Sequence, residues 1–182
     1  MILKHIKIDN IDDLQKKSIH EFNKYFGSSP HPSLEFIQSP GSWSMVKYNN
    51  SIRDNTDFFN ATKFKWSFNI KPDLVIHLSN VKAICIEAKF ESSEGMYPSN
   101  HMEKNIFKTR GLPYVKQTSL QQYMMEKLLG ISTEFIFLLQ NDNAQSNTHK
   151  TITWKEVFTK LNISDSPMFI QKWIERLRSP HL

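Results

Sequence analysis

Two short groups of polar residues, separated by thirteen positions, carry side chains that could together hydrolyse a phosphodiester. Asp73 follows Pro72, and Glu87-Ala88-Lys89 forms the second group. This hydrolysis needs a hard cation that neutralises charge on the phosphate and lowers the pKa of an attacking water. Mg²⁺ takes oxygen ligands, usually one or two carboxylates plus waters and substrate phosphate. Asp73 and Glu87 are therefore candidate metal ligands, and Lys89 could orient or deprotonate the water and stabilise developing charge.

The elements that must position these groups read as a β-hairpin. Residues 71–78 and 81–90 are rich in Val and Ile and are separated by the turn pair Ser79-Asn80. Two such runs joined by a short polar turn indicate paired antiparallel strands. Both runs are apolar over much of their length rather than cleanly alternating. They predict a central sheet that is covered on both faces.

The register of this hairpin decides whether the polar groups meet. Residues two apart on a strand share a face, so Glu87 and Lys89 point the same way. A strict two-residue turn would place Asp73 opposite Ile86, whereas a three-residue loop or one bulge places it opposite Glu87. Bulges are common beside active sites. We predict the second register, with Asp73 and Glu87 on one face.

In these residues the chain resembles the PD-(D/E)xK nuclease superfamily, which has the restriction-endonuclease-like fold. The resemblance covers about residues 12–140 in the order of elements and is specific only at the hairpin. It implies an α/β domain with a mixed central sheet flanked by helices on both faces. The implied activity is a Mg²⁺-dependent nuclease, with Mn²⁺ as an alternative ion. The implied substrate is DNA, with RNA as an alternative.

The same resemblance implies further site residues. Members often use the backbone carbonyl after the glutamate as a metal ligand, here Ala88. Many also place a glutamate from the first helix near the metal; Glu21 matches best and Glu35 second, although an exposed helix glutamate is the alternative reading. Glutamines on the helix after the motif strands are a further mark, and Gln117 and Gln121 are four residues apart, so they share a helix face. A solvated glutamine face is the alternative for that pair.

The remaining pattern predicts one α/β domain over residues 1–182, with C-terminal helices within 153–178. In chain order we expect a helix over 11–26, a loop over 28–33, a short strand over 43–48, an alternating segment over 64–70, a polar connection over 91–112, a helix from Pro113 to Leu129 that ends at Gly130, a strand over 134–140, a surface loop over 141–150, a helix from the capping box of Thr153 and Glu156 through Leu161, and a last helix after Pro167. We expect that last helix to bury Ile170, Leu177 and either Trp173 or Ile174.

The polar connection over 91–112 holds three basic residues, Lys104, Lys108 and Arg110. Long loops in compact domains are often binding loops. The chain has 23 Lys and Arg against 18 Asp and Glu, a formal net charge of +5, which favours polyanionic partners without requiring them. These three side chains are candidates for contacts with the nucleic-acid backbone, which are independent of base sequence.

Composition excludes several other classes. The single cysteine, Cys85, allows no internal disulfide, and no run of 18 apolar residues occurs. We therefore expect a cytoplasmic protein with no membrane partner. The scattered histidines lack zinc-ligand spacing, and no glycine-rich phosphate loop is present.

Alternatives to a DNA endonuclease remain open at this point. A structure-selective nuclease, such as a junction nuclease, or an RNA-directed nuclease would use the same three polar side chains. In another class, the domain would be a catalytically silent nucleic-acid-binding or assembly module of the same fold. Because one small domain offers no evident specificity module, site-specific cutting would need a homodimer or a partner chain.

Overall fold

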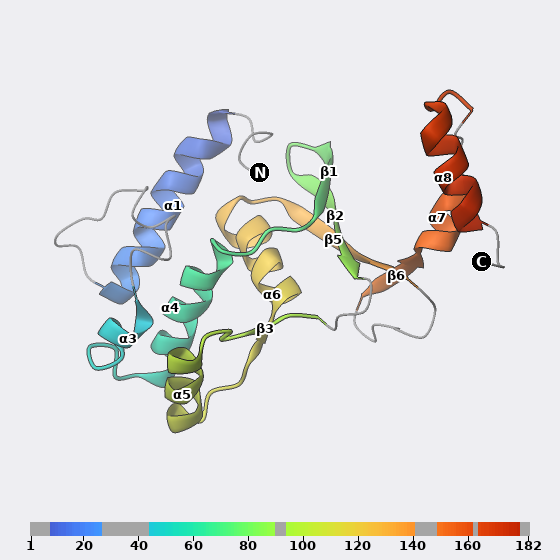
Figure 1. The fold of residues 1–182 in the computed structure, drawn as a ribbon. Coiled ribbons are helices and arrows are strands. Elements are labelled where there is room, and N and C mark those ends of the chain that lie inside the picture. The colour runs from blue at the N-terminus through green and yellow to red at the C-terminus, as the bar shows by residue number, and fades with distance from the viewer. Residues whose placement is uncertain (1–7, 27–43, 90–93, 141–148, 162–163, 179–182) are drawn as a thin grey trace.

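The hairpin predicted from the sequence forms one side of a four-stranded sheet. The computed structural model describes residues 8–26, 44–89, 94–140, 149–161 and 164–178. The sheet has the order β1-β2-β5-β6, with strands β1 (Leu74–Ser79), β2 (Lys82–Lys89), β5 (Ser132–Leu139) and β6 (Lys150–Thr153). β1 and β2 are antiparallel, whereas β2 pairs with β5, and β5 with β6, in parallel (Figure 1). A mixed α/β sheet is thus confirmed.

A long crossover joins β2 to its parallel neighbour β5. It contains β3 (Met96–Tyr97), helix α5 (His101–Arg110), β4 (Val115–Lys116), helix α6 (Gln117–Gln122) and the π-helical segment η3 (Tyr123–Leu128). β3 and β4 pair as a separate antiparallel ribbon. Parallel strands need such a crossover because the chain must return from the end of one strand to the start of the next, which a tight turn cannot do. The crossover brings α6 back against the strand that carries Glu87.

The other helices lie at two ends of the sheet. Helices α1 (Ile8–Phe26), α3 (Met45–Tyr48) and α4 (Asn55–Ser67) gather with α5 and α6 to the left in Figure 1, and α7 (Trp154–Lys160) and α8 (Met168–Arg178) follow β6 on the right. Among the described residues, no helix is long and apolar enough to cross a membrane.

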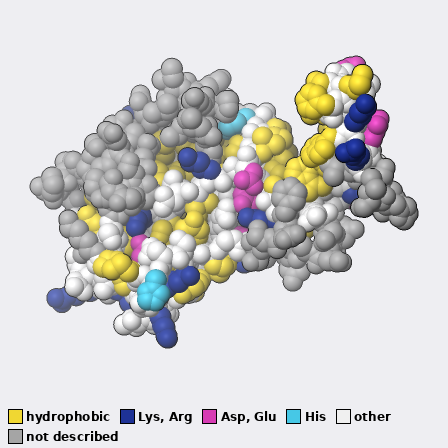
Figure 2. Space-filling view, viewed as in Figure 1, with side chains coloured by type: hydrophobic (Ala, Val, Ile, Leu, Met, Phe, Trp, Pro, Cys, Tyr) yellow, Lys and Arg dark blue, Asp and Glu magenta, His cyan; other side chains and the backbone are white. Residues whose placement is uncertain are grey.

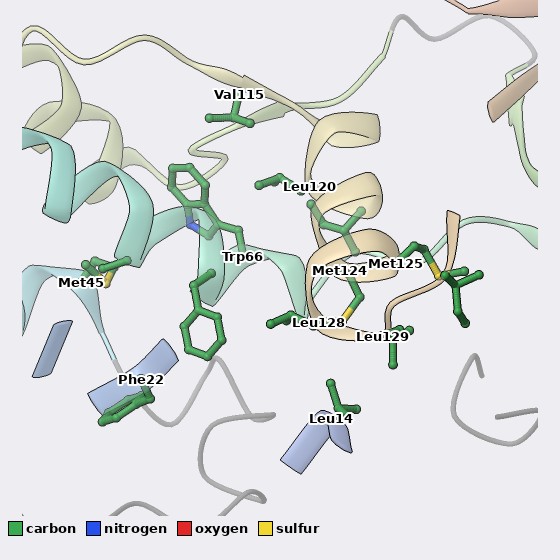
Figure 3. Packing of buried hydrophobic residues seen from close by; sticks show 14 of the residues in the cluster. Leu14, Phe22, Met45, Trp66, Val115, Leu120, Met124, Met125, Leu128 and Leu129 are labelled. Carbon is green, nitrogen blue, oxygen red and sulfur yellow. The ribbon is translucent and has the colours of Figure 1, made fainter. Parts of the chain in front are cut away.

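The hydrophobic core lies between the helical layer and β2. Figure 3 shows Leu14 and Phe22 of α1 packing towards Trp66 of α4 and towards Leu120 and Met124 of the crossover helix. Leu120 and Trp66 are at most 2% exposed. Truncating such fully buried side chains typically costs about 2–5 kcal/mol, so this packing fixes the position of α6.

Several predicted elements are confirmed. α1, β5 and α7 occupy the expected segments, and the capping box of Thr153 and Glu156 is present. Gly130 has a φ of 69°, the left-handed conformation expected just after a helix. The loop over 28–33 and most of the one over 141–150 lie outside the described residues.

Two predictions before the hairpin are wrong. Residues 45–48 of the expected short strand form helix α3, and the alternating segment over 64–70 begins inside helix α4. The α4 helix begins after its N-cap residue Asp54, whose side chain accepts a hydrogen bond from the backbone N–H of Asp57. Its residues are buried on several sides, so its sequence lacks the one-sided apolar stripe that identifies a surface helix.

Two predictions within the crossover are also wrong in part. The polar connection over 91–112 contains helix α5, which begins after the cap Asn100 and ends at Gly111, whose φ is 65°. Only Glu103 and Phe107 of that helix are buried, so its apolar signal is weak. The helix expected from Pro113 begins at Gln117, because Val115 and Lys116 pair as strand β4.

Apolar exposure differs from expectation at two places. In β1, Leu74, Ile76 and Leu78 are exposed, so the prediction of a sheet covered on both faces is wrong for this strand. In α8, Ile174 is buried, Ile170 is half-buried and Trp173 is 56% exposed, and the side chain of Leu177 lies outside what the structure describes. Hydrophobic atoms of α8 are visible at the upper right of Figure 2.

Candidate active site

A bulge sets the register of the hairpin as predicted. Leu74 lies opposite Ile86 and His77 opposite Ala83, and the register then shifts by one residue before Ser79, which lies opposite Lys82. The tight turn is therefore one residue later than the sequence suggested. Continuing the pairing beyond Leu74 places residue 73 opposite residue 87, on the same face of the sheet.

Just before β1, the Asp73 carboxylate accepts the β2 hydrogen bond that a backbone carbonyl of a longer β1 would otherwise accept. Its Oδ2 accepts a hydrogen bond of 2.8 Å from the backbone N–H of Ala88. In an extended strand the N–H and C=O of one residue point to the same side, so the Ala88 carbonyl also points towards β1 rather than towards β5. The backbone thus brings the carbonyl expected from the family resemblance to the side on which Asp73 lies.

Glu87 is buried and is held by three side chains. Its exposure is 4%. Oε1 accepts hydrogen bonds from Lys89 Nζ at 2.8 Å and from Gln117 Nε2 at 2.7 Å, and Oε2 accepts one from Gln121 Nε2 at 2.9 Å. A buried carboxylate needs such donors because its desolvation is otherwise costly. The two glutamines face the site, and the solvated alternative does not describe them.

The charges of this cluster are mixed and reach the surface. Asp73 is exposed, and the Lys89 side chain is 15% exposed. In Figure 2, acidic and basic atoms lie side by side near the middle of the visible face, over the start of β1 and the end of β2. The cluster therefore reaches solvent through Asp73 and in small part through Lys89, whereas the Glu87 carboxylate lies beneath them.

The donor set suits a hydrated divalent cation. In the described part of the chain, no three His, Cys, Asp or Glu side chains are close enough to hold a metal ion together. Asp73 and Glu87 provide two carboxylates, which is the number that Mg²⁺ commonly takes from a protein. Gln121 Oε1, on the amide that binds Glu87, is a buried acceptor with no donor among the described residues. The two carboxylates and this polar surrounding fit a hydrated ion.

Glu21, the third acidic residue expected here, contacts other partners. Its Oε2 lies 3.5 Å from the Tyr25 hydroxyl. Burial raises the pKa of Tyr123, and the charge of Glu21 raises it further. Glu21 also lines a cleft of about 370 Å³ with Lys127 and Leu128. The structure does not group it with Asp73 and Glu87, and Glu35 lies outside the described residues.

The three basic residues predicted to bind nucleic acid are in two different environments. Lys104 and Lys108 are exposed and four residues apart on α5, so they share a face of that helix. The Arg110 guanidinium instead binds the chain before α4, with 2.7 Å to the Ile52 carbonyl and 2.9 Å to Asn49 Oδ1, and lies over the Phe58 ring. Its described contacts serve packing.

A neighbouring cluster was not found from the sequence. Glu94 Oε1 accepts hydrogen bonds from the backbone N–H of Thr118, at 3.0 Å, and from the Thr118 hydroxyl. His149 Nε2 lies 3.2 Å from that hydroxyl. A lone glutamate in a polar run gives no sequence signal for a partner 24 residues later. Helix N-termini attract acidic groups, but the sequence predicted the helix start at Pro113 rather than at Gln117, so this preference did not point to Thr118.

Comparison with protein-family models, with curated proteins and with solved structures finds no match to this chain.

Proposed function

We propose that the chain is a metal-dependent nuclease of the PD-(D/E)xK type that hydrolyses DNA as an endonuclease. The observation that carries the proposal is the grouping of Asp73, Glu87 and Lys89 at the end of the hairpin. Gln117 and Gln121 hold the buried carboxylate of Glu87 from a separate helix. An accidental surface pair of Glu and Lys would not need two amide donors, one buried (Gln121) and one half-buried (Gln117).

Each residue has a definite role in this proposal. Asp73, Glu87 and the Ala88 carbonyl would hold Mg²⁺ or Mn²⁺, which would supply the positive charge that neutralises a phosphate and lowers the pKa of a water. Lys89 would orient that water. As the water oxygen bonds to phosphorus, the water releases a proton to solvent, one P–O ester bond breaks, and the departing oxygen takes up a proton from solvent. Gln117 and Gln121 keep the Glu87 carboxylate in place.

Nucleic acid is the substrate class that the charge distribution favours. The net charge is +5, and Lys104 and Lys108 present two cations on one face of α5. Such contacts bind phosphates without reading bases. Site-specific cutting would require a second copy or a partner chain that supplies base contacts.

The test is a cleavage assay on supercoiled, linear double-stranded and single-stranded DNA and on RNA, with Mg²⁺, Mn²⁺ or EDTA. Wild type is compared with Asp73→Ala and Lys89→Ala. Lys82→Ala is the matched control, because Lys82 is an exposed lysine at the other end of the same strand. We expect metal-dependent cutting of DNA that both site variants abolish and the control retains.

Two results would contradict this proposal. Equal cutting by wild type and both site variants would mean that Asp73 and Lys89 take no part in cleavage. Absence of cutting on every substrate, combined with salt-sensitive DNA binding, would favour the binding module instead. A preference for RNA would change the substrate and keep the mechanism.

A further inference from the structure

Residues 94–97 run alongside the start of helix α6, next to the candidate active site. Met96 pairs with Lys116 and Tyr97 with Val115 in the β3–β4 ribbon. Beyond this ribbon, the backbone N–H of Gln117 donates to the carbonyl of Gly95 at 2.8 Å. The segment therefore contacts the residue whose side chain binds Glu87.

Glu94 supplies the cap that helix α6 lacks in its own sequence. The N-cap residue is Lys116, which makes no side-chain cap hydrogen bond. The Thr118 backbone N–H donates to Glu94 Oε1 instead, and Lys116 Nζ lies 3.7 Å from Glu94 Oε2. A carboxylate at this position satisfies a free N–H and complements the positive end of the helix. Glu94 thus fixes the first turn of α6, from which Gln117 extends.

Gly95 leaves room for the Gln117 side chain. A Cβ atom built on Gly95 would lie 2.6 Å from Gln117 Oε1, closer than real contacts allow. Backbone conformation does not explain this glycine, since Gly111 and Gly130 are the glycines with positive φ in the described part of the chain. The contact to avoid is with the far end of a flexible side chain. A methyl group at position 95 would therefore displace the Gln117 amide rather than unfold the domain.

We propose that Glu94 and Gly95 are positioning residues that hold the Gln117 amide against Glu87: Glu94 by capping α6, and Gly95 by leaving the space that the amide occupies. For its effect on catalysis, this inference rests on the proposed function. It adds two residues that touch neither the substrate nor the reacting atoms and that act through Gln117.

The first test reads the position of Gln117 directly and does not depend on activity. In ¹⁵N-labelled protein without metal, the side-chain amide resonances of Gln117 are assigned from their loss in Gln117→Ala. We expect Gly95→Ala to shift these resonances and to leave those of Gln122 unchanged. Gln122 is the matched reporter because it lies on α6 and binds Glu126 on the exposed side of the helix. Unshifted Gln117 resonances would overturn the role of Gly95.

The second test is a double-mutant cycle on cleavage. Since displacements of about 1 Å can cost up to a hundredfold in rate, we expect Gly95→Ala to lower kcat/KM by roughly tenfold to a hundredfold. In a Gln117→Ala background the same change should have less than about a twofold effect, because the clashing amide is gone. Equal losses in both backgrounds would overturn the inference.

Glu94 is tested by a pair of variants in the same two assays. Glu94→Ala should shift the Gln117 resonances and lower kcat/KM. Glu94→Gln should restore most of both, because its amide oxygen still accepts from Thr118. Equal effects of the two variants would overturn the capping role. If wild type cleaves nothing, the proposed function fails while the resonance shifts still decide the positioning inference.

Discussion

Two lysine–glutamate pairs with the same geometry lie in different parts of the molecule. Lys65 Nζ is 2.8 Å from Glu103 Oε1, and Lys89 Nζ is 2.8 Å from Glu87 Oε1. Both glutamates are buried. The first pair joins α4 to α5, and the second lies on β2 at the candidate active site. Distance and burial of the glutamate therefore do not separate a structural pair from a candidate functional one.

The neighbours of each pair make the difference. The second oxygen of Glu103 accepts a hydrogen bond from Trp66 Nε1 at 2.9 Å, and the Trp66 ring packs on Phe107. That pair is enclosed by aromatic rings. Glu87 instead has two amide donors and lies opposite Asp73 in the strand register. The β2 pair therefore differs in having an exposed second carboxylate, Asp73, beside it.

The largest expected contrast comes from replacing each lysine by methionine. Lys65→Met leaves the buried charge of Glu103 without its cation, which typically costs about 3–5 kcal/mol. Lys89→Met leaves Glu87 with Gln117 and Gln121, so we expect a cost of about 1 kcal/mol. For cleavage the order reverses. Lys89→Met should lower kcat roughly 10³-fold, whereas Lys65→Met should retain activity at temperatures where it is folded.

Urea denaturation and single-turnover cleavage of the two variants measure this contrast. A Lys65→Met, Glu103→Leu double variant is the matched control, because removing both charges should cost less than removing one. Similar stability losses in the two lysine variants would mean that the pairs are equivalent and that the surroundings do not distinguish them.

The sequence could predict the hairpin and its glutamines but not the α4–α5 pair. Val- and Ile-rich strands, a short turn and the Glu-x-Lys spacing are local signals, and Gln117 and Gln121 share a face through helical periodicity. Lys65 and Glu103 are 38 residues apart, and each is an ordinary charged residue in its own segment. Their pairing depends on how α4 packs on α5, and that packing is determined by buried rings far apart in the chain.

The hydrophobic pattern alone also did not determine the register of the hairpin. Pattern alone allowed two registers, one of which separates Asp73 from Glu87. The chemistry of the polar residues selected the right one, and the structure has the bulge between His77 and Ser79. Position 94, by contrast, offered neither a pattern nor a chemical reason, because the hydrogen bond it makes appears only once β3 lies beside β4.

The second prediction separates a structural cation of α5 from two that are candidates for DNA contacts. Arg110 resembles Lys65, since its guanidinium donates to the Ile52 carbonyl and to Asn49. A lysine cannot reproduce this fork, so Arg110→Lys should cost about 2 kcal/mol of stability. Lys104→Ala and Lys108→Ala should instead leave stability unchanged. Each should lower the slope of log Kd for DNA against log salt by about one.

DNA titrations at several salt concentrations check this division. Arg110→Lys should keep the wild-type slope once it is measured below its melting temperature. A lowered slope for Arg110→Lys, with unchanged slopes for both lysine variants, would assign the nucleic-acid contact to the arginine and reverse the division.

The third prediction is that Mg²⁺ stabilises the protein through the β2 pair and Asp73, and not through the α4–α5 pair. A ligand that binds the folded state at ten times its Kd adds about 1.4 kcal/mol of stability. For a domain of this size that shifts Tm by about 4 °C. Wild type and Lys65→Met should both show this shift with saturating Mg²⁺, and Asp73→Asn should not. Thermal melts with Mg²⁺ and with EDTA measure it, and an equal shift in all three proteins would place the ion elsewhere.

The smallest expected effect comes from the thiol that precedes the β2 pair on the same face. Burial raises the pKa of Cys85 to about 12. Because the unfolded thiol ionises near pH 8.5, the unfolded state loses its proton first, and this contribution to stability, complete at neutral pH, declines as pH rises towards 12. Between pH 8 and 9 we expect a loss of about 0.7 kcal/mol. Urea midpoints over this range measure it.

Cys85→Ala should flatten the dependence of stability on pH, and an unchanged slope would mean that another group titrates. Burial also raises the pKa values of Tyr25, Tyr97 and Tyr123. Because unfolded tyrosines ionise near pH 10, these side chains contribute little below pH 9, and the cysteine dominates the slope there.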